Sequence, residues 1–199
     1  MDNKRALIAI FAMEVKGERA DPRALAKRLG LRAAEARESM EELGKAKMIA
    51  FDGGSARLTP KGRKSIRVVF MGGGFELIHY GHVYTITKAK ELGDVLVIAV
   101  ARDSTIRKRK SREPLVNEGD RVKLLSSLRD VDAAVLGVEG DIYVTLQKVR
   151  PDVVALGYDQ YHMDEEVKRE ARKRGMKLRV VRLDSPYPSI KTTRILKEL

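Results

Sequence analysis

Short apolar runs alternate with helix-like segments over most of the chain after residue 65. The apolar runs are five to seven residues long, which is typical of buried strands, and lie at residues 66–71, 95–101, 132–136, 152–156 and 177–181. Segments with helical spacing follow them at residues 80–92, 118–128, 141–149, 165–173 and 192–199. This alternation predicts an α/β fold with a parallel sheet and helices on both faces, which binds ligands beyond the carboxyl ends of its strands.

The first 64 residues have a different pattern. Three segments with helical spacing come first, at residues 6–15, 21–29 and 32–43. Asp21 is a predicted N-cap before Pro22, and Gly30 follows the end of the second helix. Two short runs around an Asp-Gly-Gly turn then predict a hairpin over residues 48–60. Because three helices and a hairpin resemble a winged helix-turn-helix, we predict a winged-helix-like domain over residues 1–64 and a Rossmann-like domain over residues 65–199.

The first strand of the second domain leads into a predicted phosphate-binding site. Three glycines at residues 72–74 follow the strand, and His79, Gly81 and His82 open the next helix. The first turn of a helix has unpaired N–H groups and partial positive charge, and glycines let a phosphate approach the backbone. The glycines alone predict only a flexible turn. Two histidines on one turn beside them favour an anion site, since imidazoles donate hydrogen bonds to phosphate oxygens.

Two other kinds of site are not supported by these residues. A zinc site needs a third ligand, but the chain has no cysteine and His162 is distant in the sequence. The Walker phosphate loop is also absent, because G-x-x-x-x-G-K-[ST] occurs nowhere in the chain. The position of the whole string between a strand and a helix is what favours the anion site.

Residues 73–82, GGFELIHYGH, resemble the G-x-F-D-x-x-H-x-G-H signature of the cytidylyltransferase-like nucleotidyltransferases. The resemblance continues to the C-terminus, and LGYDQ at residues 156–160 is most similar to archaeal FAD synthases, which are FMN adenylyltransferases. SIKTT at residues 189–193 is similar to the I-S-T-T element of the family. The chain departs from the family pattern at Glu76, where Asp is usual, and at Lys191, where Ser is common.

The resemblance implies that an acceptor phosphate attacks the α-phosphorus of a nucleoside triphosphate and releases pyrophosphate. His79 and His82 would stabilise the transition state, while Lys110 or Lys108, together with Arg121, would counter the charge of the triphosphate. Residues 107–110 predict a basic loop for this contact, or a loop that is only solvated. Mg²⁺ would be carried mostly by the nucleotide, with help from Glu76. The predicted nucleotide-binding residues are Gly73, Gly74, Phe75, Gly81, Asp103, Gly157, Asp159, Ser189, Thr192 and Thr193.

The substrates follow from the same resemblance. Residues 156–160 favour ATP and FMN, which would give FAD. The alternative within the class is a cytidylyltransferase that uses CTP and glycerol 3-phosphate or a similar phosphorylated alcohol. The alternative from another class is a DNA-binding regulator whose second domain senses a nucleotide or a flavin.

Charge bears on the role of the first domain. The net charge of +12 is shared between the domains, because residues 1–64 hold 15 Lys and Arg against 9 Asp and Glu. The predicted recognition helix carries four glutamates that would oppose DNA phosphates: Glu35, Glu38, Glu41 and Glu42. Packing or homodimer formation is therefore favoured over DNA binding. The lack of cysteine, of a signal-peptide pattern and of a long apolar stretch predicts a cytoplasmic protein without a membrane segment.

Overall fold

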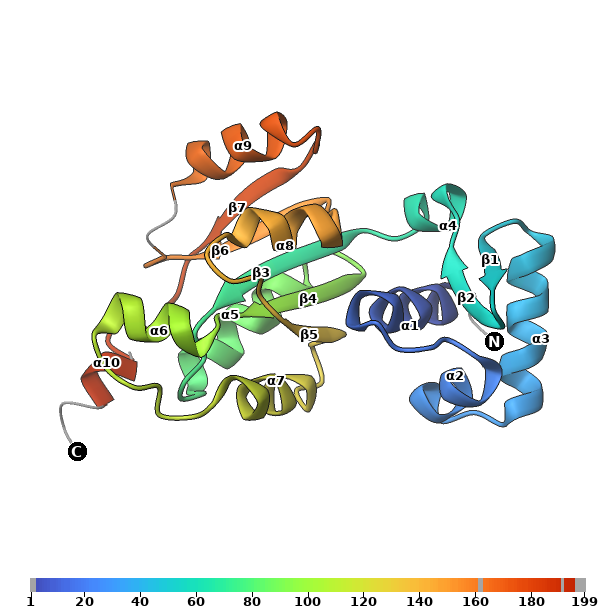
Figure 1. The fold of residues 1–199 in the computed structure, drawn as a ribbon, viewed down its shortest axis with the longest axis horizontal. Coiled ribbons are helices and arrows are strands. Elements are labelled where there is room, and N and C mark those ends of the chain that lie inside the picture. Colours follow the sequence, from blue (N-terminus) through green and yellow to red (C-terminus); the bar gives the residue numbers. More distant parts are fainter. Residues whose placement is uncertain (1–2, 161–162, 191, 196–199) are drawn as a thin grey trace. The chain divides into compact units, whose positions relative to one another are not determined.

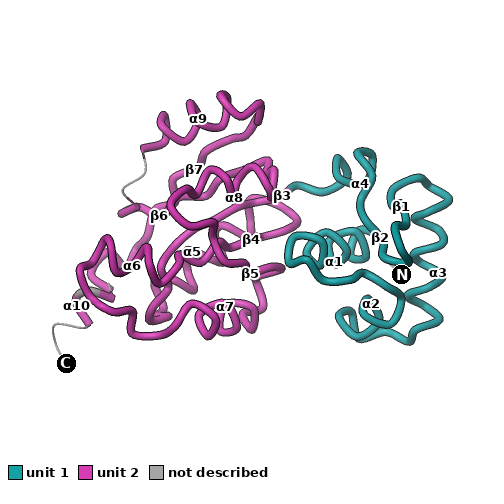
Figure 2. The backbone as a smooth tube through the Cα atoms, viewed as in Figure 1, with its two compact units in different colours: residues 1–67 teal, residues 68–199 magenta. Residues whose placement is uncertain are grey.

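The computed structural model describes residues 3–160, 163–190 and 192–195 (Figure 1). The chain divides into two compact units, residues 1–67 and residues 68–199, which Figure 2 shows in teal and magenta. We call them unit 1 and unit 2 and describe each by itself. Within the described residues, every helix is too short or too polar to span a bilayer.

Unit 1 consists of helices and one small hairpin. Its elements are α1 (Asn3–Lys16), α2 (Pro22–Leu29), α3 (Ala33–Lys45), β1 (Ile49–Asp52), β2 (Ser55–Leu58) and α4 (Pro60–Lys64). The Asp21 carboxylate accepts a hydrogen bond from the Ala24 amide at 2.9 Å and caps α2, and Gly30 ends this helix with a φ of 67°. The two strands pair in antiparallel fashion. The resemblance of this unit to a winged helix-turn-helix stays a prediction.

Unit 2 is built around a five-stranded parallel sheet. Its strands are β3 (Val68–Gly73), β4 (Val95–Val100), β5 (Ala133–Leu136), β6 (Val153–Gly157) and β7 (Arg179–Leu183), in the order β5-β4-β3-β6-β7. Its helices are α5 (Tyr80–Lys90), α6 (Asp103–Lys110), α7 (Glu118–Ser126), α8 (Ile142–Val149), α9 (Asp164–Lys173) and α10 (Thr192–Ile195). The predicted α/β fold is confirmed. Because β3 is bordered by β4 on one side and β6 on the other, the strand order reverses there, and ligands bind at such a reversal.

Helices cover both faces of the sheet. Alternate residues of β3 point to opposite faces, so Val69 and Met71 share one core with Ile86 of α5. On the other face, a Cβ atom added to Gly72 would lie 2.8 Å from Cδ1 of Ile142 in α8. The strand end is therefore packed from both sides, and the residues after Gly73 emerge at the carboxyl edge of the sheet.

Strand β3 reaches further toward the predicted site than the sequence indicated. The apolar run predicts a strand that ends at Met71, but Gly72 and Gly73 also pair with β4, opposite Ala99 and Val100. Glycine is disfavoured in strands, so a prediction based on apolar side chains ends the strand at Met71. The backbone of the next two residues nevertheless continues to pair with β4. Two of the three glycines are therefore fixed by strand pairing.

The predicted basic loop over residues 107–110 is wrong, because these residues form the last turn of helix α6. Arg and Lys are good helix formers, and Ser111 ends the helix in the left-handed conformation with a φ of 51°. At the other end of α6, the Glu118 carboxylate accepts a hydrogen bond from the Asp103 amide at 2.8 Å. The predicted final helix is observed as α10, and residues 196–199 lie outside the described residues.

Candidate active site

The signature segment, residues 73–82, connects the end of β3 to the start of α5. Phe75 has a left-handed φ of 50°, and a Cβ atom on Gly73 would lie 2.7 Å from the Phe75 ring. His79 is the N-cap residue of α5, and a Cβ atom on Gly81 would lie 3.2 Å from its Nδ1 atom. Glycine at these two positions therefore lets an aromatic ring and an imidazole lie directly against the backbone.

The two histidines of the segment form a stacked pair. Their ring centroids are 3.9 Å apart with an angle of 29° between the planes, and the Phe75 ring lies 5.4 Å from that of His82. Both side chains are half-buried, yet neither Nδ1 atom has a hydrogen-bond partner within the described residues. Buried polar atoms without partners are uncommon in folded proteins, so they favour a ligand at this place.

The surroundings keep both imidazoles neutral. Burial first, and then the neighbouring His79, lower the pKa of His82 to about 4, against an opposing effect from Asp159. Burial also lowers the pKa of His79, and Asp159 again opposes the shift. At neutral pH each ring therefore carries one N–H donor and no net charge.

This shift predicts a pH-dependent stability. The unfolded chain protonates His82 near pH 6.5, whereas the folded protein does so only near pH 4. Between these values the unfolded state binds more protons, so the free energy of unfolding falls as the pH is lowered. We expect a loss of about 2 kcal/mol between pH 7.5 and pH 4.5, after allowance for the partial exposure of the ring. Urea unfolding at both pH values checks this, and a pH dependence in His82→Gln equal to that of wild type would contradict it.

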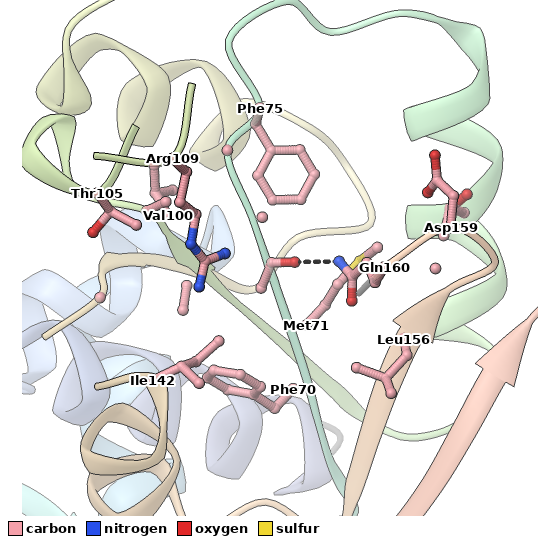
Figure 3. A pocket seen from close by; sticks show the side chains of 18 of the residues that line it. Phe70, Met71, Phe75, Val100, Thr105, Arg109, Ile142, Leu156, Asp159 and Gln160 are labelled. Atoms are coloured by element: carbon pink, nitrogen blue, oxygen red, sulfur yellow. Dashed lines mark hydrogen bonds between the residues drawn. The ribbon is translucent and has the colours of Figure 1, made fainter. Parts of the chain in front are cut away.

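A cavity of about 1000 Å³ lies beside the histidine pair, at the carboxyl edge of the sheet. Figure 3 shows its two sides, which are separated by the end of β3. Thr105 and Arg109 lie on one side, and Asp159 and Gln160 lie on the other. The Gln160 Nε2 atom donates a hydrogen bond to the Gly72 carbonyl oxygen at 2.6 Å, drawn as the dashed line. The cavity thus extends to both sides of the strand end.

Most of the predicted site residues line this cavity. They are His79, His82, Gly73, Gly74, Phe75, Gly81, Gly157, Asp159 and Thr192. In the described part of the chain, Glu76, Asp103, Lys110, Arg121 and Ser189 do not line it. The Thr193 side chain and Lys191 lie outside the described residues. The structure therefore brings together predicted site residues from three separate segments of the sequence, as the edge of a parallel sheet requires.

The basic residues of α6 divide into two groups. Lys108 and Arg109 line the cavity. Lys110 instead forms an ion pair with the buried carboxylate of Glu76, and Arg107 pairs with Glu113 at 2.9 Å. The geometry therefore favours Lys108 for the phosphate contact that the sequence assigned to Lys110 or Lys108. It does not support Glu76 as a magnesium ligand, because both of its oxygens accept hydrogen bonds from cationic side chains.

Arg121 is completely buried and does not face the cavity. Its guanidinium donates hydrogen bonds to the Val116 carbonyl at 2.9 Å, the Gly74 carbonyl at 2.5 Å and the Asp103 carboxylate at 2.5 Å. Each of its three nitrogen atoms therefore donates a hydrogen bond within the protein. This geometry favours a role for Arg121 and Asp103 in the shape of the signature segment over the predicted contacts with the nucleotide.

Some residues that line the cavity were not predicted. Ser104 and Thr105 begin α6, Tyr187 precedes α10, and residues 137–141 follow β5. A signal for the last group was present, because GVEG at residues 137–140 comes directly after the third predicted strand. The carboxyl ends of all parallel strands meet at one edge, so the rule that identified the ends of the other strands applies here too.

Together these observations define a class of protein. A parallel sheet whose central strand ends in glycines beside paired histidines and basic side chains is typical of an α/β nucleotide-binding protein.

Comparison with known proteins agrees with this class. Residues 70–198 match the model of the cytidylyltransferase-like family. A FAD synthase from Aciduliprofundum boonei is 48% identical over 58% of this chain and 76% of its own length. A FAD synthase from Thermococcus kodakarensis is 43% identical over 69% of this chain and 93% of its own length. The crystal structure of the lipopolysaccharide core biosynthesis protein from Thermoplasma volcanium is 39% identical, with a TM-score of 0.58 over 60% of this chain and 98% of that one. The chain therefore belongs to the cytidylyltransferase-like family.

Proposed function

We infer that this nucleotidyltransferase moves the AMP group of ATP to the phosphate of FMN, which gives FAD and pyrophosphate. The observation that carries this inference is the stacked pair of His79 and His82 beside the glycine-rich end of β3. The cavity volume of about 1000 Å³ is at the upper end for ligand pockets and suits two substrates. Two relatives are FAD synthases, which favours ATP and FMN over CTP and glycerol 3-phosphate.

The proposed reaction is a direct displacement at phosphorus. An oxygen of the FMN phosphate forms a bond to the α-phosphorus of ATP while the bond from that phosphorus to the β-phosphate oxygen breaks, and pyrophosphate leaves. The acceptor is already an anion at neutral pH, so no general base is needed. His79 and His82 would each donate one N–H to phosphate oxygens as their charge grows, and Lys108 would counter the charge of the leaving pyrophosphate.

Mg²⁺ fits this site as an ion carried by the nucleotide. Magnesium commonly binds through one or two carboxylates together with substrate phosphates. In the part of the chain that the structure describes, no three His, Cys, Asp or Glu side chains form a group that would hold a metal ion alone. Asp159, at the cavity, would supply a carboxylate ligand in place of Glu76. Bound there, the ion would withdraw charge from the phosphates.

Product formation tests the proposed function. The full chain is incubated with Mg²⁺ and ATP or CTP, each combined with FMN or glycerol 3-phosphate, and the products are separated by chromatography. We expect FAD from ATP and FMN only. A CDP-linked product would overturn the proposed substrates, ATP and FMN, but not the proposed nucleotidyl transfer. If no pairing gave a product, the result would favour a regulator that senses a nucleotide or a flavin.

We further propose that unit 1 serves packing or homodimer formation rather than DNA binding. Glu38, Glu41 and Glu42 are exposed on α3, where they would oppose DNA phosphates. Light scattering of the full chain tests for a dimer, and gel retardation at low salt tests for DNA binding. A monomer that retards duplex DNA at low salt would overturn this proposal and leave the transferase proposal untouched.

A further inference from the structure

The carboxylate of Glu76 is the centre of a buried ion-pair cluster. None of its side chain is exposed. It accepts hydrogen bonds from Lys110, from Arg112 at 2.7 and 3.1 Å, and from the Leu115 amide at 3.3 Å. Burial disfavours the ionised form, but the hydrogen bonds from Arg112 and Lys110 outweigh it and lower the pKa of Glu76 to about 2. We call Glu76, Lys110 and Arg112 the Glu76 cluster.

This cluster connects two segments that both border the cavity. Glu76 belongs to the signature segment, whereas Lys110 ends α6 and Arg112 follows it, 34 and 36 residues later in the sequence. A charge taken out of water is tolerated only where its hydrogen bonds are satisfied, so the carboxylate restricts where the end of α6 can lie. The cluster therefore fixes α6 relative to the histidine-bearing segment.

The rotation of α6 about its axis decides which cations face the cavity. An α-helix has 3.6 residues per turn, so side chains two positions apart point in directions that differ by about 200°. With Lys110 directed to Glu76, Lys108 lies on nearly the opposite side of the helix, where it lines the cavity. Within the described residues Lys108 has no ion-pair partner, so its charge is available to a ligand in the cavity that it lines.

We propose that Glu76 is a positioning residue that orients α6 so that Lys108, and not Lys110 or Arg112, meets the substrate phosphates. This inference rests on the proposed function, since it takes the triphosphate of ATP as the ligand of Lys108. It also gives a reason for the longer side chain at position 76. A glutamate reaches one methylene further than the aspartate usual in the family, and this carboxylate binds two cations and one backbone amide.

The test measures whether the contribution of Lys108 depends on Glu76. Binding of ATP with Mg²⁺ is measured by calorimetry for four full-length proteins: wild type, Lys108→Met, Glu76→Gln and the double variant. In the wild-type background we expect Lys108→Met to weaken binding about tenfold or more, since hydrogen bonds to charged groups are strong. In the Glu76→Gln background we expect Lys108→Met to weaken ATP binding less than about threefold. A Lys108 that no longer faces the phosphates contributes little to the affinity, so its removal changes the affinity little.

A matched control uses Glu113, an exposed carboxylate that follows α6 and pairs with Arg107 of that helix. In Glu113→Gln the full effect of Lys108→Met should remain. Equal losses in the wild-type and Glu76→Gln backgrounds, or no effect of Lys108→Met in either, would overturn the proposal. If Glu76→Gln does not fold, Lys110→Met replaces it, since this change removes the partner that belongs to α6 and leaves the carboxylate paired with Arg112.

The readout separates this proposal from the proposed function. ATP binding does not require FMN to be the acceptor. A failure to form FAD, combined with the expected coupling between Lys108 and Glu76, would overturn only the choice of acceptor. FAD formation combined with additive effects of the two substitutions would overturn only the positioning role.

Discussion

Replacing His82 with alanine is expected to lower kcat for FAD formation about 1000-fold, with less than a tenfold change in the affinity for ATP. The imidazole lies in the first turn of α5, and its Nδ1 atom is buried without a partner within the described residues. An imidazole that is already fixed there can bind phosphate oxygens with little further loss of conformational entropy. Its contribution is largest when negative charge grows on those oxygens, so the loss appears mainly in kcat. Steady-state product assays and calorimetric titration with ATP measure the two effects.

The neighbouring residue gives a matched control for this substitution. Val83 follows His82 on α5, is exposed, and does not line the cavity. Val83→Ala should leave kcat within about twofold of wild type, because substitutions on an exposed surface change the stability of a protein little. A His82→Ala enzyme that retained its rate would contradict the proposed site. An equal loss in Val83→Ala would instead indicate that any change in this turn of the helix disturbs the fold.

The sheet and its binding edge could be predicted because they depend on local patterns. Four of the five strands of unit 2 are short apolar runs, and a helical segment follows every strand. The alternation of such elements requires a parallel sheet, and a parallel sheet gathers the ends of its strands at one edge. His79 and Asp159 were therefore expected at a common site although they are far apart in the sequence, and both line the cavity.

The roles of the charged residues could not be predicted in the same way. The sequence shows that Glu76, Lys110 and Arg121 are near the ends of elements, but not which way each side chain points. Charged residues are rarely buried completely, so exposure and contact with the ligand were the expected states. In the structure Glu76 and Arg121 are both buried, and their partners lie between 5 and 47 residues away. Only tertiary packing decides such pairs.

Replacing Arg121 with methionine is expected to lower the free energy of unfolding of unit 2 by about 4 kcal/mol. The guanidinium is completely buried and donates to the Gly74 carbonyl, the Val116 carbonyl and the Asp103 carboxylate. Methionine fills a similar volume but donates nothing, so a carboxylate and two carbonyls lose a partner in a completely buried site. Urea unfolding followed by circular dichroism measures the change, and the transition of unit 2 is identified in the wild-type protein as the one that ATP shifts to higher urea concentration.

Two further substitutions decide between this positioning role and the catalytic role that the family resemblance implied for Arg121. Arg121→Lys keeps the charge but lacks the planar set of donors, so it should recover less than half of the lost stability. Arg129→Met removes an arginine whose side chain is 96% exposed and should leave the unfolding midpoint unchanged. If Arg121→Met unfolded like wild type yet no longer bound ATP, Arg121 would contact the phosphates after all. We expect instead that stability falls together with ATP binding, because the Gly74 carbonyl that Arg121 binds belongs to the segment that lines the cavity.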